Sequence, residues 1–195
     1  MSQRHTDATV LEAARECVAE VGVRRTTVAD VARRAGASRM TVYRLFPDAR
    51  TLWSTLLTTE FTEVVRQAEA ESATLPTARE RLVATTAAVV ERVAADPVVR
   101  RVLELDPDLL VPYIVDRLGQ SQRLAIAHFR RYLDEGQRDG SIRDVDAGVV
   151  TYLLQLVVGS LVMASRVSEQ ETDPALLTRE LRHMLDAYLR HEGSR

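Results

Sequence analysis

The chain of 195 residues contains no lysine and no asparagine, so all 26 of its basic side chains are arginines. Codon usage in a GC-rich genome explains this bias more simply than a special arginine chemistry. Cys17 is the only cysteine, which excludes an intramolecular disulfide and is compatible with a reducing cytosol. Its place in an apolar helical pattern favours a small core residue. The first ten residues contain no apolar stretch, so we expect no secretory signal and a cytoplasmic protein.

Patterns typical of enzymes and metal sites are also missing from the sequence. The four histidines lie far apart, and none has a metal-ligand spacing such as H-x-x-x-H. There is no phosphate-binding loop, no G-x-S-x-G elbow and no dinucleotide fingerprint. Acid pairs such as Asp106 and Asp108 stand at predicted helix starts, where capping explains them. We therefore expect no enzyme, no metal and no cofactor, because a small helical enzyme would need a site that the sequence does not offer.

What the chain does contain is typical of a soluble globular protein, with 46% hydrophobic and 28% charged residues. The charges are unevenly placed along it. Residues 1–53 carry nine arginines against six acids, whereas residues 54–195 carry 17 arginines against 22 acids. A mildly basic head on an acidic body fits a small DNA-contacting domain joined to a sensing domain.

The stretch from Thr27 to Phe46 predicts two short helices joined by a turn. Thr27 stands where a helix N-cap should, before an apolar stripe at helical spacing. Gly36 follows that stripe, where a left-handed backbone can end a helix without a Cβ penalty. Ser38 then caps a second helix, so the stretch reads as a helix-turn-helix.

The second helix of this pair has a narrow apolar face and a polar outer face. Val42, Leu45 and Phe46 fall at i, i+3 and i+4, which predicts that they anchor the helix. The opposite face suits a DNA major groove, because arginine can bind guanine bidentately and methionine can touch a thymine methyl group. We predict base contacts from Arg39, Met40, Thr41 and Arg44, and phosphate contacts from Thr27, Ser38, Tyr43 and Arg50.

These residues resemble the signature of the tetracycline-repressor (TetR) family. The match runs in order from Thr27 through Gly36 and Ser38 to Phe46. The chain departs from the family pattern at Met40, Leu45 and Ala49. The family usually has His or Tyr in place of Leu45 and Lys in place of Ala49, and both commonly contact phosphate. Arg44 and Arg50 are expected to replace these contacts.

The resemblance implies an all-α fold with two domains, a helix-turn-helix DNA-binding domain at 1–47 and a helical ligand-binding and dimerisation domain at 48–195. A long amphipathic helix from Asp48 to about Ser72 is the expected lever between them. The segment 147–165 carries no charge over 19 residues, which also suits a membrane span, but its Gly, Thr, Gln and Ser residues and lack of an aromatic belt argue against one. The helices near 145–167 and 173–190 resemble the family's dimerisation pair, which implies a homodimer on a double-stranded DNA operator.

The family also implies a small-molecule effector, whose identity the sequence does not give. Candidate pocket residues combine a polar atom, or an apolar wall, with a mostly apolar helix. They are Phe61, Tyr113, His128, Phe129, Tyr132, Tyr152, Gln155 and Met163. The main hypothesis is therefore a ligand-responsive transcriptional regulator that binds a pseudo-palindromic operator as a dimer. A repressor is favoured over an activator. The alternative is a helical ligand-binding or protein-interaction module with a vestigial DNA head.

Overall fold

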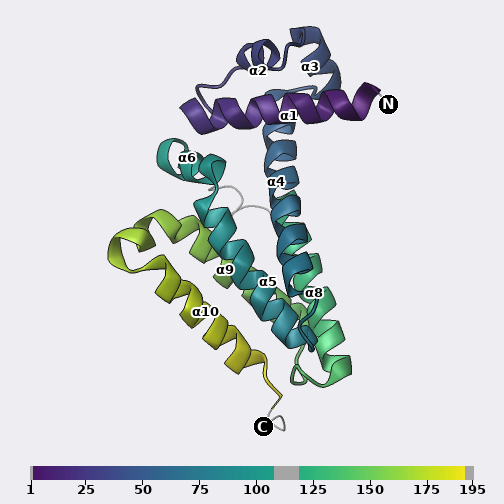
Figure 1. The fold of residues 1–195 in the computed structure, drawn as a ribbon, viewed down its shortest axis with the longest axis vertical. Helices are drawn as coiled ribbons and strands as arrows, with labels where there is room; N and C mark the ends of the chain where they lie inside the picture. The colour runs from purple at the N-terminus through teal and green to yellow at the C-terminus, as the bar shows by residue number, and fades with distance from the viewer. Residues whose placement is uncertain (1, 108–118, 192–195) are drawn as a thin grey trace. The chain divides into compact units, whose positions relative to one another are not determined.

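The computed structural model describes residues 2–107 and 119–191, and its regular elements there are all helices (Figure 1). An isolated bridge between Ile142 and Arg190 is the exception to helical pairing in this part of the chain. The all-α prediction is confirmed. The helices are α1 (Ser2–Val21), α2 (Val28–Arg34), α3 (Arg39–Leu45), α4 (Ala49–Ser72), α5 (Ala78–Ala95), α6 (Pro97–Leu105), α8 (Gln120–Asp139), α9 (Ala147–Glu171) and α10 (Pro174–Leu189).

Local capping signals explain most of these helix starts. Before α4, the Thr51 backbone N–H donates to Asp48 Oδ1 at 2.7 Å. Thr77 and Glu80 satisfy each other's backbone N–H groups in a capping box before α5. Asp96 accepts hydrogen bonds from the first turn of α6, with Pro97 at the first helical position. Helix α1 begins at Ser2.

The chain divides into two compact units. The first contains the chain up to Glu60 together with the segment that starts at Asp96, and the second contains Phe61–Ala95 and the chain from Gly119 onward. Helix α4 thus contributes residues to both units, and α6 belongs with α1 rather than with α5. The predicted domain limits, 1–47 and 48–195, stay a prediction about independent folding.

The first unit has its own hydrophobic core. Helix α1 provides its centre, with Cys17 buried as predicted, and burial raises the pKa of this thiol. The remaining side chains come from α2, α3, the first turns of α4, and α6. The fully buried members with the largest side chains are Val10, Val18, Val31, Val42, Leu52, Leu56 and Val98.

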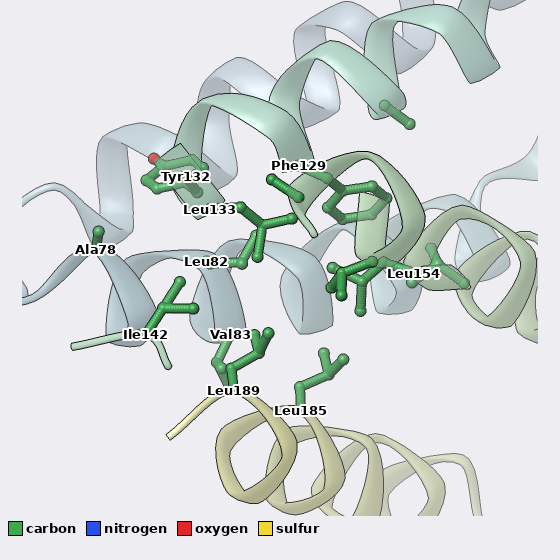
Figure 2. Close-up of a cluster of buried hydrophobic side chains, with 14 of the residues drawn as sticks. Ala78, Leu82, Val83, Phe129, Tyr132, Leu133, Ile142, Leu154, Leu185 and Leu189 are labelled. Carbon is green, nitrogen blue, oxygen red and sulfur yellow. The ribbon is translucent and has the colours of Figure 1, made fainter. Parts of the chain in front are cut away.

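The second unit packs α5, α8, α9 and α10 around a separate core. Figure 2 shows Leu82 and Val83 of α5 pointing toward the α8, α9 and α10 side chains of this cluster. Gly136 of α8 permits a close approach, because a Cβ there would lie 2.4 Å from Ile142 Cδ1. The other labelled members are Ala78, Phe129, Tyr132, Leu133, Ile142, Leu154, Leu185 and Leu189.

Helices α9 and α10 bury one side and leave apolar side chains exposed on another. In α10 the buried stripe is Thr178, Leu181, Leu185 and Leu189. Met184 and Tyr188 of the same helix are exposed. On α9 the stripe Val150, Leu154 and Val158 is buried. The exposed apolar face, as we call it below, consists of Val149, Tyr152, Leu153 and Leu156 of α9 with Leu176, Met184 and Tyr188 of α10.

Among the described residues, α9 is the one helix long and apolar enough to cross a membrane. Length and composition are weak grounds for a span, because the core helix of a globular unit meets the same criteria. Here Val150, Leu154 and Val158 belong to the second core, so one stripe of the helix contacts protein.

Candidate nucleic-acid interface

Helices α2 and α3 begin at the two predicted caps. The Thr27 side chain accepts a hydrogen bond from the Asp30 backbone N–H, and the Ser38 side chain accepts one from that of Thr41. Between the helices, Gly36 has a φ of 63°, the left-handed conformation that glycine adopts most easily. The helix-turn-helix geometry is therefore fixed by local signals that the sequence shows directly.

Helix α3 has the two faces that the sequence predicts. Val42 and Phe46 are buried in the first core, and Leu45 packs against it. On the opposite side Met40 is 77% exposed and Tyr43 46% exposed. The predicted base-contacting residues Arg39 and Arg44 are also exposed, and Thr41 is half-buried. The helix offers a polar and polarisable surface of the kind that enters a major groove.

The arginines of α2 form ion pairs, whereas those in and just after α3 pair with no described carboxylate. Arg33 Nη2 lies 2.7 Å from Asp30 Oδ1, and Arg34 Nη2 lies 2.8 Å from Glu20 Oε2. Among the described side chains, no carboxylate lies within ion-pair distance of Arg39, Arg44 or Arg50. Their guanidinium groups are available to an external anion without breaking an internal contact.

The hydroxyl groups of the two caps are already engaged. Thr27 Oγ1 donates to Asp30 Oδ2 at 2.5 Å, and the Thr27 backbone N–H donates to the same oxygen. These hydrogen bonds, followed by the Arg33 guanidinium, lower the pKa of Asp30 to about 2. Ser38 Oγ lies 2.9 Å from Thr41 Oγ1. Phosphate contacts from Thr27 and Ser38 stay a prediction, and a phosphate would have to share donors with the caps.

Sequence reasoning missed Arg25, which has the same character as the available arginines. It is exposed in the turn before α2, and no described carboxylate pairs with it. The neighbouring Arg24 Nε instead lies 3.7 Å from Asp106 Oδ1. The sequence could not distinguish these adjacent arginines, because the carboxylate that engages one of them comes from a distant helix.

Three of the predicted pocket residues come together on α8. The His128 ring lies 4.9 Å from the Tyr132 ring and 5.9 Å from the Phe129 ring, both in edge-to-face geometry. Phe61 packs against the same core. Beside them is a groove of about 520 Å³ on α4, α5 and α8. Its lining residues are Arg66, Glu69, Ala70, Ala73, Arg81, Arg131, Tyr132 and Glu135.

The other pocket candidates among the described residues do not line this groove. Tyr152 is 52% exposed and belongs to the exposed apolar face. Gln155 is buried and Met163 half-buried, both on α9. Tyr113 lies outside the described residues. The described part of the chain contains no group of three or more His, Cys, Asp or Glu side chains suited to a metal ion.

His128 lies in a largely buried ion-pair cluster of the second unit. Its Nδ1 lies 2.8 Å from Glu69 Oε1, and since a carboxylate only accepts, we assign the proton to Nδ1. Arg131 pairs with the same carboxylate. Burial lowers the pKa of His128, and the Arg131 charge adds to this, although Glu69 acts in the opposite direction.

We predict that the free energy of unfolding falls as the pH drops below about 6.5, the ordinary histidine pKa. There the unfolded chain binds a proton at His128 that the folded chain refuses, so acid favours the unfolded state. Denaturant titrations between pH 7.5 and 5 should show a steeper loss for wild type than for His128→Gln. Exposed His183→Gln is the matched control and should keep the wild-type slope; equal slopes for wild type and His128→Gln would contradict the prediction.

The fold and this site together define a helix-turn-helix DNA-binding protein. Residues 10–52 match the family described as "Bacterial regulatory proteins, tetR family". An uncharacterized HTH-type transcriptional regulator of Mycobacterium tuberculosis strain H37Rv, Rv2250c, is 36% identical over 184 residues, which is 94% of each chain. One of Mycobacterium bovis, Mb2274c, has the same identity and coverage. The chain belongs to the TetR family of HTH-type transcriptional regulators, as its sequence predicted.

Solved structures share the fold over nearly the whole chain. The regulator FadR from Bacillus subtilis, in complex with stearoyl-CoA, has a TM-score of 0.71 at 18% identity and covers 94% of this chain and 99% of its own. A regulator from Saccharomonospora viridis in complex with choline has a TM-score of 0.67 at 19% identity, covering 97% and 100%. Because two such different ligands occur on one fold, the likeness supports the fold and does not select a ligand.

Proposed function

We propose that the protein is a cytoplasmic, homodimeric, ligand-responsive repressor that binds a pseudo-palindromic operator through α3. The observation that carries this proposal is the free guanidinium groups of Arg39 and Arg44 on the exposed face of α3. Bidentate contacts from such groups read base edges, whereas phosphate contacts position the helix. We assign base contacts to Arg39, Met40, Thr41 and Arg44, and phosphate contacts to Thr27, Ser38, Tyr43 and Arg50. The alternative of a vestigial head gains no support from this site or from the relatives.

The exposed apolar face supports a dimer. Tyr152, Leu153 and Leu156 lie on one helix and remain exposed although they are large and apolar. Contiguous apolar surface of this kind marks an interaction site on a soluble protein. We propose that α9 and α10 meet their copies in a four-helix bundle with two-fold symmetry. The same symmetry would place the two copies of α3 on DNA half-sites whose centres lie roughly one helical turn, or a multiple of it, apart.

The proposed effector site is the groove beside Tyr132 and His128. The groove is bordered by the second-unit part of α4, with α5 and α8 completing it. An effector there would contact α4 between Arg66 and Ala70. Because α4 also contributes to the first core, a ligand that prefers one position of this helix can change operator affinity, to the extent of that preference.

Binding to the operator should weaken steeply with salt, because each neutralised phosphate releases counterions. Genomic fragments selected by the wild-type protein provide the operator, and fluorescence anisotropy at increasing salt gives the slope. We expect a loss of roughly 10³-fold in affinity between about 50 and 200 mM salt if about six phosphates are contacted. A protein that selects no fragment, or one that binds independently of salt, would contradict the proposed function.

A further inference from the structure

Asp106 is the C-cap residue of α6, and its buried carboxylate contacts the turn between α1 and α2. It is 3% exposed. Its Oδ2 accepts hydrogen bonds from the backbone N–H groups of Val23 at 2.8 Å and Arg24 at 3.3 Å. The helix start that this residue is predicted to cap lies outside the described residues; within them, its carboxylate accepts from the turn between α1 and α2. A carboxylate that accepts two amide hydrogen bonds out of water is a strong and directional contact.

The turn is shaped to admit this carboxylate. Gly22 has a φ of 84°, and a Cβ on it would lie 2.9 Å from Asp106 Oδ2 and 3.1 Å from Leu105 Cδ1. A side chain at Gly22 would therefore both strain the backbone and push α6 away. Both sides of the contact are specialised, since the turn lacks a side chain where the carboxylate approaches.

Helix α6 is held to α1 along its whole length. At its start, Arg15 Nη2 of α1 lies 3.4 Å from Asp96 Oδ2. In the middle, Arg101 Nε donates to the Ala19 carbonyl at 3.0 Å. Figure 1 shows α6 beside the C-terminal end of α1. The Asp106 contact is the last of this series, and it reaches past α1 into the turn.

The turn leads directly into the helix-turn-helix formed by α2 and α3. Thr26 Oγ1 donates to the Gly22 carbonyl at 2.7 Å, which closes the turn, and Thr27 follows as the N-cap of α2. The backbone that Asp106 holds is therefore separated from the N-cap of α2 by two residues. Its orientation sets where α2 begins and, through the short connection after α2, where α3 lies.

We propose that Asp106 is a positioning residue for DNA recognition, which holds the α1–α2 turn so that α2 and α3 can dock on the operator. The inference rests on the proposed operator binding. A positioning role and a purely electrostatic role predict opposite changes in operator affinity when Asp106 is replaced. Removing one negative charge from a DNA-binding unit should strengthen binding by charge alone, whereas loss of the acceptor should weaken it.

Two variants with the same charge change separate these effects. Asp106→Ala removes both acceptor oxygens, and Asp106→Asn keeps one oxygen that can accept from Val23 and Arg24. On the operator fragment selected by wild type, we expect Asp106→Ala to bind roughly tenfold more weakly, as for lost hydrogen bonds of this kind. Asp106→Asn should stay within about threefold of wild type. Glu104→Gln, which removes an exposed charge on the same helix, is the control.

An Asp106→Ala protein that binds as tightly as wild type, or more tightly, would overturn the inference. Equal losses for Asp106→Ala and Asp106→Asn would do so as well. Should Asp106→Ala fail to fold, amide hydrogen exchange of the wild-type protein decides: Val23 and Arg24 should exchange slowly, and exchange at the rate of an open loop rejects the contact. If wild type itself selects no operator, the proposed function fails, and the exchange result still reports on the turn.

Discussion

Leu156→Arg should convert the dimer into a monomer and reduce operator affinity by about 100-fold or more. Leu156 is 56% exposed on the apolar face of α9. In a two-fold interface each arginine would meet the apolar face of the partner, where its charge loses water. A monomer presents a single helix-turn-helix. The gain in affinity from binding two half-sites at once, typically 10² to 10⁴, therefore disappears.

Sedimentation velocity at micromolar concentration and anisotropy on the full operator measure the two effects. The matched control is Leu124→Arg, because Leu124 is an exposed leucine, 40% accessible, on α8 and outside the exposed apolar face. That variant should remain dimeric and bind normally. A dimeric Leu156→Arg protein would reject α9 as the interface, and a monomer with full operator affinity would reject the link between dimerisation and DNA binding.

Arg44→Ala should cost about 1–3 kcal/mol of binding free energy at each half-site, the range for a lost bidentate base contact. The guanidinium group is exposed in the last turn of α3 and has no described carboxylate partner, so nothing internal is disturbed when it is removed. Because one base pair would lose its reader, discrimination at that position should also relax.

Binding to operators with single base-pair changes tests this directly. Arg33→Ala is the matched control, since Arg33 is an exposed arginine of α2 whose guanidinium is already paired with Asp30. The control should keep the wild-type preference at every position. Wild-type discrimination at all positions in Arg44→Ala would remove Arg44 from the set of base readers, and a uniform loss with an altered salt slope would make it a phosphate contact instead.

The helix-turn-helix was predictable because the sequence signals that begin and end its helices are local. Thr27, Ser38 and Gly36 each act within a few residues of themselves, through a cap or a left-handed turn, and the structure places all three as predicted. The exposed face of α3 follows from the same helical spacing. Sequence periodicity therefore suffices for a short helix whose one buried side is defined by Val42 and Phe46.

Contacts between distant segments were not predictable in this way. Asp106 looked like one more capping residue, because nothing near it in the chain indicates Val23 and Arg24 as its partners. Tyr152 was predicted to line a pocket because α9 is apolar on most sides, and the pattern does not say which side faces the core. The assignment of α6 to the first unit likewise depends on packing against α1, which composition does not report.

If α9 and α10 pair through their exposed apolar face as proposed, the lifetime of the protein should depend on its copy number. Each tenfold dilution of protomers removes about 1.4 kcal/mol from the free energy that favours assembly. For a dimer whose protomer gains stability from its partner, this dilution also raises the unfolded fraction. Chaperones and proteases act on that fraction, so a cell with few copies would clear the regulator faster. Gene dosage would therefore set operator occupancy twice, through the number of dimers formed and through how long each chain survives.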